Sequence, residues 1–233
     1  MTRIDWQHIP FFATVDSCGL RKLDVCVRPH GFPAGAAIFS EGDDCAGLHV
    51  LLEGMVRIYR VNTEGRLHTL NLLQPVATFN EVAAIDGGAN PFNATAVTQV
   101  EAAVIPHRDL LAIMASEPTL MANTVQALAR LNREYIERLE DMTFRTIPAR
   151  LAKLFLTETN AIDPVASAPS QLTQEEIAAI LGTTREVVGR AMRQLMNAGL
   201  LRKKGRHVYV ADRAGLAALA DSGALREETA AER

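Results

Sequence analysis

Three charged residues near the C-terminus, Arg185, Glu186 and Arg190, have the side-chain types and the spacing needed to read base pairs. An Arg side chain can donate two hydrogen bonds to guanine, and a Glu side chain can accept one from cytosine. At about 100° per residue on a helix, these three share a face with Gly189 and Arg193. The opposite face is apolar and consists of Val187, Val188, Ala191 and Leu195. We therefore expect a helix that buries its valines and turns its charged face toward the major groove of DNA, where the glycine permits a close approach.

A second short helix is expected just before this one, with a turn between them at Gly182. Thr173 followed by Glu176, and Thr183 followed by Glu186, have the spacing of capping boxes at the two N-termini. An ordinary helical hairpin with a solvated charged face has the same pattern, and Glu186 could then serve only to cap its own helix. The segment after the second helix helps to distinguish the two interpretations.

Residues 197–210 predict a β-hairpin with a basic tip. The tip runs from Arg202 to Arg206 and places Gly205 at the turn. A helix-turn-helix followed at once by a basic hairpin is the winged form, in which the hairpin can hold the sugar–phosphate backbone while the helix reads bases. The two motifs together favour double-stranded DNA as a partner.

The net charge of −3 is divided unevenly along the chain. Residues 1–145 hold 12 Lys and Arg against 17 Asp and Glu, whereas residues 146–213 hold 10 against 6. The basic surplus therefore falls on the predicted DNA-binding part, where a phosphate backbone can neutralise it. An acidic total does not count against DNA.

The composition is that of a soluble globular protein. Of the 233 residues, 48% are hydrophobic and 22% are charged. We expect no signal peptide and no contact with a membrane, because no stretch approaches the roughly 20 apolar residues of a membrane span. Three irregularly spaced cysteines, Cys18, Cys26 and Cys45, favour a reducing cytoplasm over a disulfide framework.

Residues 1–117 predict a mostly β domain after a short N-terminal helical segment. Residues 56–61 alternate in part between apolar and polar side chains, and residues 62–65 supply a hairpin turn. Thr95 to Ile105 is expected as the last strand, and Asp109 to Ser116 as a short helix. Short strands punctuated by glycines favour an antiparallel β-roll of the jelly-roll or barrel type.

Residues 118–145 predict one long helix. Its apolar positions recur at steps of three and four residues: Met121, Thr124, Leu128, Leu131, Tyr135 and Met142. This pattern indicates a coiled-coil-like dimer seam, and a helix packed on its own domain is the alternative. Another helix begins near Pro148, residues 160–170 form a loop, and the tail from Ala214 is expected to fray. The predicted fold is α+β, with domains at 1–117, 118–145 and 146–233.

This order of elements resembles the cyclic-AMP receptor protein / fumarate-nitrate regulator (CRP/FNR) family of transcription factors. The residues that carry the resemblance are 38–43, 51–59 and 172–200. It implies a homodimer joined along the long helix, an inverted-repeat operator, and an effector in the β-roll that reorients the two recognition helices. It also implies RNA polymerase as a partner and a regulator rather than an enzyme.

The resemblance also assigns roles to individual residues near the recognition helix. Base contacts fall on Arg185, Glu186 and Arg190, and backbone contacts on Gln174, Thr184, Lys204 and Arg206, with Arg193 on the same face. The fumarate-nitrate branch has Ser where Gly189 stands here. We therefore expect half-sites closer to TGTGA than to TTGAT.

The β-roll departs from the pattern of the cyclic-nucleotide members. Those proteins cradle the phosphate with Gly-Glu-x-x-Leu followed by Arg-Ser/Thr-Ala. Here Glu81 matches, Asn80 replaces the Gly, and Phe92 and Asn93 stand in place of Arg-Ser/Thr. These four are the candidate effector-pocket residues. Without the Arg, no bidentate donor meets a cyclic phosphate, so cyclic AMP is not the expected effector.

Two cofactors, an iron–sulfur cluster and haem, can be weighed against the cysteines and histidines of this sequence. An iron–sulfur cluster needs about four thiolates at cluster spacing, so three scattered cysteines do not favour one. Haem is a candidate, because some family members bind it and one histidine of the β-roll could be an axial ligand. The histidines concerned are His8, His30, His49, His68 and His107. A dimer that binds DNA without any ligand is a further alternative.

A different class of function is a small-molecule-binding or cupin-like metal enzyme in the roll, with the C-terminal part as a passenger. Metal cupins need clustered His and Glu on neighbouring strands, whereas His49 and His68 are isolated in sequence. The sequence contains no evident Ser-His-Asp, phosphate-loop or paired-carboxylate arrangement. We therefore predict no catalytic and no metal-binding residues.

Overall fold

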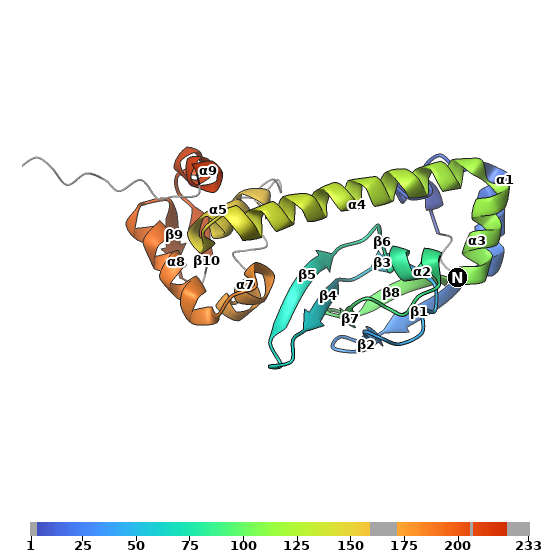
Figure 1. Ribbon diagram of the computed structural model, residues 1–233, viewed down its shortest axis with the longest axis horizontal. Helices are drawn as coiled ribbons and strands as arrows, with labels where there is room; N and C mark the ends of the chain where they lie inside the picture. Colours follow the sequence, from blue (N-terminus) through green and yellow to red (C-terminus); the bar gives the residue numbers. More distant parts are fainter. Residues whose placement is uncertain (1–3, 159–171, 206, 223–233) are drawn as a thin grey trace, which may run out of the picture. The chain divides into compact units, whose positions relative to one another are not determined.

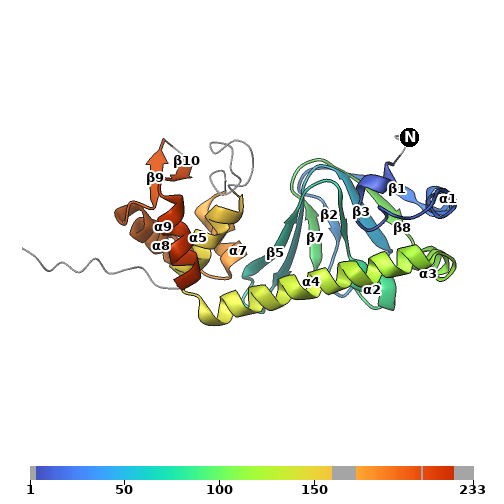
Figure 2. The same cartoon turned by 90° about the horizontal axis from the view of Figure 1, so that it is seen from above.

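The computed structural model describes residues 4–158, 172–205 and 207–222. The chain divides into two compact units, Met1–Arg133 and Glu134–Arg233, and helix α4 (Pro118–Phe144) contributes to both. Figure 2 shows α4 as one continuous helix. The loop predicted at 160–170, Arg206 and the end of the tail lie outside the described residues. Within the described ranges, no helix is long and apolar enough to span a membrane.

The first unit is built around two four-stranded antiparallel sheets (Figure 1), which confirms the predicted β-roll. One sheet has the order β1 (Arg28–Phe32), β8 (Val100–Ile105), β3 (Leu48–Glu53), β6 (Ala77–Phe79). The other has the order β2 (Ala37–Phe39), β7 (Asn93–Ala96), β4 (Val56–Val61), β5 (Leu67–Leu73). A short helix, α2 (Glu81–Asp86), follows β6.

The single strand predicted from Thr95 to Ile105 is wrong, because this stretch is two strands in two different sheets. β7 ends at Ala96 and β8 begins at Val100, and the residues between them are exposed. A hydrogen bond holds this turn: the Met55 backbone N–H donates to Thr98 Oγ1 at 3.0 Å. Alternation of apolar residues continues through the turn, so the pattern alone does not reveal the change of sheet.

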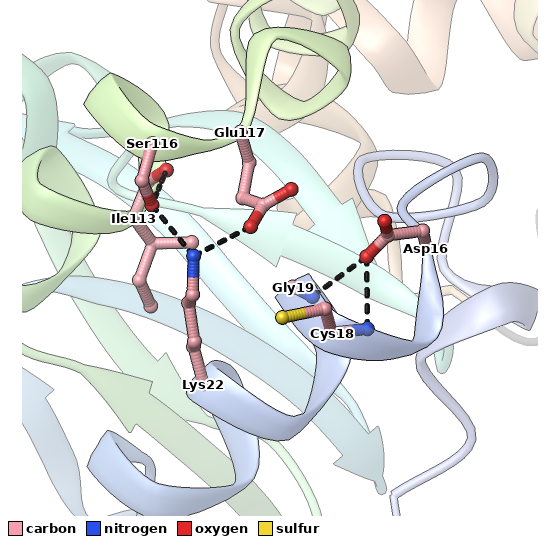
Figure 3. A network of polar contacts seen from close by, with 7 residues as sticks. All are labelled: Asp16, Cys18, Gly19, Lys22, Ile113, Ser116 and Glu117. Carbon is pink, nitrogen blue, oxygen red and sulfur yellow. Dashed lines mark hydrogen bonds and ion pairs between the residues drawn. The ribbon is translucent and has the colours of Figure 1, made fainter.

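The N-terminal segment packs on the roll and on the end of helix α3 (His107–Ser116). It contains a 3₁₀ turn, η1 (Trp6–His8), and helix α1 (Ser17–Cys26), which Asp16 caps by accepting from the N–H groups of Cys18 and Gly19. Figure 3 shows Lys22 of α1 reaching Ser116 and Glu117, at 2.9 and 2.6 Å. Glu117 is the single residue between α3 and α4.

The second unit is helical, with a two-stranded hairpin. Its elements are the end of α4, α5 (Ile147–Glu158), α7 (Gln174–Leu181), α8 (Arg185–Asn197), β9 (Leu201–Lys204), β10 (His207–Val210) and α9 (Arg213–Ser222). One core joins the helices and includes Leu151, Phe155 and Leu195. The expectation that the tail frays from Ala214 is wrong, since α9 continues to Ser222 and buries Leu216 and Leu219.

Candidate functional site: a nucleic-acid interface

The turn between α7 and α8 is fixed by its caps. Thr173 and Glu176 form the predicted capping box at the start of α7: the Glu176 N–H donates to Thr173 Oγ1, and the Thr173 N–H donates to the Glu176 carboxylate. Gly182 ends α7 with a left-handed φ of 63°, which a residue with a side chain rarely adopts. The Arg150 guanidinium donates to the Leu181 carbonyl at 2.6 Å and so covers the end of the helix.

The second capping box, predicted at Thr183, is wrong. The residue that caps α8 is Thr184, and its side chain makes no capping hydrogen bond to the helix. Glu186 is instead in the first turn, where its carboxylate accepts from its own backbone N–H and from the Thr184 hydroxyl, and these bonds lower its pKa. Glu186 is exposed, so its carboxylate accepts hydrogen bonds within the first turn and is also accessible to solvent.

The predicted faces of α8 are largely confirmed. Arg185, Glu186 and Arg190 are exposed on one face. The opposite face packs into the core through Val188, Ala191, Met192 and Leu195, while Val187 is half-buried. The helix thus presents its charged side chains outward from a rigid base, as a major-groove reader requires.

Gly189 is the exception, because it is buried and not part of the exposed surface. A Cβ added to it would lie 3.4 Å from Gln174 Oε1 and 4.0 Å from a terminal nitrogen of Arg193. Gly189 therefore leaves room for the side chain of Gln174.

The residues expected to contact the DNA backbone are exposed where the structure describes them. Gln174 starts α7, Thr184 caps α8, Arg193 lies on α8, and Lys204 ends β9. β9 and β10 pair antiparallel from Leu201↔Val210 to Lys204↔His207, and Gly205 turns between them with a φ of 62°. The predicted basic wing is thus present in the described part of the hairpin.

The candidate effector pocket centres on Asn80, which is 1% exposed. Its φ is 67°, and Asn is the side-chain-bearing residue that best tolerates this left-handed conformation, so the replacement of Gly keeps the local backbone. Its amide Nδ2 donates to Asn90 Oδ1 at 2.8 Å and to Cys45 Sγ at 3.3 Å. Its Oδ1 has no partner, leaving a buried hydrogen-bond acceptor.

The structure brings the other three pocket candidates into the same part of the roll. Burial raises the pKa of Glu81, whose carboxylate accepts from the Thr78 hydroxyl at 2.7 Å. Phe92 and Phe79 both contact the ring of Phe39, at centroid distances of 5.9 and 6.0 Å. The amide of Asn93 is already engaged, because it accepts from the Glu41 N–H and donates to the Tyr59 carbonyl.

The histidine considered for haem that lies deepest is His49, at 3% exposed. Burial lowers its pKa to about 4, and its Nδ1 bonds the Gly47 carbonyl at 3.0 Å. Its ring packs against Phe39 and Phe79 at 5.2 and 4.9 Å, so a porphyrin would have to displace one of these rings. Haem does not fit His49 as it is placed. In the described residues, no group of three or more His, Cys, Asp or Glu side chains is arranged to hold a metal ion.

The predicted dimer seam on α4 is partly an exposed apolar surface. Met121, Tyr135 and Met142 are exposed, and Leu128 and Leu131 are half-buried. Thr124 is buried and donates to the Leu120 carbonyl, so it does not face outward. Other exposed apolar residues of α4 are Leu139, which can replace Arg138 in the heptad pattern, and Val125, Ile136 and Phe144, which lie outside that pattern. We name the surface of Met121, Val125, Leu128, Tyr135, Ile136, Leu139 and Met142 the α4 stripe.

Two family models match separate parts of the chain. A model described as "Cyclic nucleotide-binding domain" matches residues 29–117, and one described as "Crp-like helix-turn-helix domain" matches residues 149–219. These matches define a DNA-binding regulator whose sensor domain is of the cyclic-nucleotide type.

Relatives make the family explicit. The chain is 30% identical over 210 residues to a CRP-like cAMP-activated global transcriptional regulator of Mycobacterium tuberculosis, covering 88% of this chain and 94% of that one. It is 31% identical to the cyclic AMP receptor protein of Thermus thermophilus, over 73% and 78% of the two chains. A crystal structure of a CRP/FNR-family regulator from T. thermophilus, 27% identical, covers 84% of this chain and 100% of its own with a TM-score of 0.68. The chain belongs to the CRP/FNR family of transcriptional regulators.

Proposed function

We propose that this regulator reads an inverted-repeat operator with Arg185, Glu186 and Arg190 of each subunit. The observation that carries this proposal is the geometry of α8, whose opposite face is anchored in the core while these three side chains are exposed. Gln174, Thr184, Arg193 and Lys204, with Arg206, hold the backbone on either side. Gly189 is consistent with a TGTGA-like half-site.

We propose that the regulator is a homodimer joined along the α4 stripe. Leu139 is 66% exposed and Ile136 59% exposed in the single chain, and a second copy of the helix would cover both. An inverted repeat requires two recognition helices related by a two-fold axis, which a parallel pair of α4 helices supplies. RNA polymerase is the proposed further partner, and the cytoplasm the proposed location.

We propose that the effector is not cyclic AMP, although two relatives are named for it. Residues 79–96 contain no Lys or Arg, so this segment offers no cationic donor to a phosphate. Its buried acceptor without a hydrogen-bond partner among the described residues is the Asn80 Oδ1. This pocket suits a ligand that donates hydrogen bonds.

The test measures binding of the full chain to labelled duplexes by fluorescence anisotropy. The duplexes carry an inverted repeat of TGTGA, an inverted repeat of TTGAT, or a scrambled sequence, each with and without cyclic AMP. We expect the TGTGA repeat to bind best and cyclic AMP to leave the affinity unchanged. Equal affinity for all three duplexes would refute base reading, and a cyclic-AMP-dependent gain would refute the proposal on the effector.

An absorption spectrum of protein purified anaerobically tests the remaining cofactors. A Soret band would show haem, and broad visible absorption would show an iron–sulfur cluster. We expect no iron–sulfur band, because the cysteines are scattered, and no haem on His49, because phenylalanine rings enclose it; a Soret band would assign haem to another histidine of the roll.

A further inference from the structure

A groove of about 280 Å³ opens in the second unit between the start of α7, the middle of α8 and the β9–β10 hairpin. Its floor is apolar and consists of Leu172, Ile177, Met192, Met196 and Val208. Its rim is polar and includes Gln174 from α7, Arg193 from α8 and Lys203 from β9. We name it the rim groove.

The polar rim converges above Gly189. Gln174 Oε1 and an Arg193 terminal nitrogen both lie within 4.0 Å of the point that a Gly189 Cβ would occupy. An uncharged hydrogen-bonding group and a guanidinium, carried by two different helices, are therefore brought to one place. The missing side chain at Gly189 is what allows them to approach the helix backbone.

The groove is electrostatically one-sided. Arg193 and Lys203 are exposed cations, and the described residues that line the groove include no carboxylate. Two carboxylates follow Gln174 in sequence but do not line the groove. Glu175 is exposed, and the Glu176 carboxylate accepts from the backbone N–H and the hydroxyl of Thr173. An anion that entered the groove would meet two positive side chains, one able to donate two parallel hydrogen bonds and one acting as a point charge.

Lys203 points to the groove because of its register in the hairpin. It pairs with Val208, which also lines the groove, whereas Arg202 pairs with Tyr209. Successive side chains of a strand alternate between its faces, so Arg202 is directed to the other side of the hairpin. Arg202 and Lys203 are thus not equivalent, although both are basic.

We propose that the rim groove holds one sugar–phosphate unit of the bound DNA, with Arg193 and Lys203 on the same phosphate and the deoxyribose against the apolar floor. This rests on the proposed DNA-binding function and adds Lys203 and the floor residues to it.

The first experiment compares Lys203→Ala with Arg202→Ala, which removes the same charge one residue away. Affinity for the TGTGA duplex and for the scrambled duplex is measured from low to high salt. For Lys203→Ala we expect an equal loss on both duplexes and a salt slope smaller by about 0.9, the value for one phosphate contact on duplex DNA. A slope for Lys203→Ala that equals that of the wild type, or a change no larger than that of Arg202→Ala, overturns the proposal.

The second experiment locates the phosphate with duplexes in which one phosphate at a time is a neutral methylphosphonate. At one position, we expect the substitution to weaken the wild type most and each of Lys203→Ala and Arg193→Ala less, because each variant has lost one of the two contacts to that phosphate. The double variant, which has lost both contacts, should be unaffected at that position. If the two variants lose sensitivity to methylphosphonate at different positions, or at no position, Arg193 and Lys203 do not share a phosphate and the proposal is overturned. Competition by inorganic phosphate that is equal in the wild type and Lys203→Ala also overturns it. Failure of the wild type to prefer the TGTGA duplex would count against the proposed function instead.

Discussion

Gly189 of the recognition helix lies against the side chain of Gln174, which starts the preceding helix; a Cβ on Gly189 would be 3.4 Å from Gln174 Oε1. The position that distinguishes branches of the family is therefore in contact with a proposed backbone-binding residue and is itself buried. We therefore expect the residue at position 189 to affect DNA binding by setting the position of the Gln174 side chain.

Substitution of Gly189 tests this contact. Gly189→Ala places its Cβ at the limit of ordinary contact and gains helix propensity, so we expect the free energy of unfolding to rise by up to about 1 kcal/mol. Gly189→Val pushes Gln174 away, and we expect weaker binding to every duplex. Thermal unfolding and anisotropy titrations measure the two effects. Unchanged affinity in the Val variant would show that Gln174 is not positioned by Gly189.

Glu186 has two roles that can be separated. Glu186→Ala and Thr184→Ala both remove the hydrogen bond between these side chains, and we expect each to lower the thermal unfolding midpoint slightly and to a similar extent. Only Glu186→Ala is expected to relax discrimination, by about 1–3 kcal/mol at a single base pair. Binding to duplexes with one substituted base pair distinguishes them. If the two variants have identical sequence preferences, Glu186 is a capping residue alone.

The α4 stripe predicts a dimer that a single charge can separate. Leu139→Glu places a carboxylate on an exposed site, so we expect dissociation to monomers without loss of helical signal. Gln126→Glu makes the same change of charge at an exposed position of α4 outside the stripe and should leave the dimer intact. Sedimentation equilibrium gives the mass of each. A Leu139→Glu protein that remains dimeric would place the interface elsewhere.

The left-handed backbone at Asn80 predicts an unusual order of stabilities. Asn80→Gly keeps the backbone conformation, whereas Asn80→Ala adds a steric cost of about 1–2 kcal/mol at a φ of 67°. Both variants lose the hydrogen bond to Asn90, so their difference isolates the backbone. Urea unfolding should find the Gly variant more stable than the Ala variant. The reverse order would contradict the left-handed assignment.

Burial of His49 predicts a loss of stability in acid. Its pKa is lowered from 6.5 to about 4, so the unfolded chain binds a proton that the folded chain does not. The stability of the folded state is therefore complete above pH 6.5 and falls as the pH drops toward 4, by about 3 kcal/mol in total. His49→Phe should remove this part of the pH dependence. Parallel unfolding curves for the two proteins across pH 4–6.5 would contradict it.

Much of the fold is predictable from periodicity in the sequence. The strands of the roll, the long helix, the helix-turn-helix and the wing each have a local pattern that tertiary contacts reinforce, and Thr173 with Glu176 marks a helix start to the residue. The cap of α8 lies one residue beyond its predicted position because Thr183 and Thr184 are both good caps, and the turn at Gly182 decides between them.

The remaining errors arise where tertiary packing overrides a local signal. The alanines and charges of helix α9 are typical of a disordered end, and they hide the spacing of Leu216 and Leu219 on one buried face. Thr124 fits a heptad position but satisfies its hydroxyl on the preceding turn. The burial of Gly189 depends on the path of α7, which no pattern within α8 records.

The contact of Lys22 with Glu117 and Ser116 limits where this protein can be divided. The sequence match to a cyclic nucleotide-binding domain begins at residue 29, yet Phe12, Val15 and Leu23 are core residues of the same unit. Gly19 packs so closely that a Cβ there would lie 3.1 Å from the Glu117 side chain. A minimal sensor cut at the family boundary would therefore lose a wall of its own core, and an isolated sensor suitable for ligand screening must begin before η1.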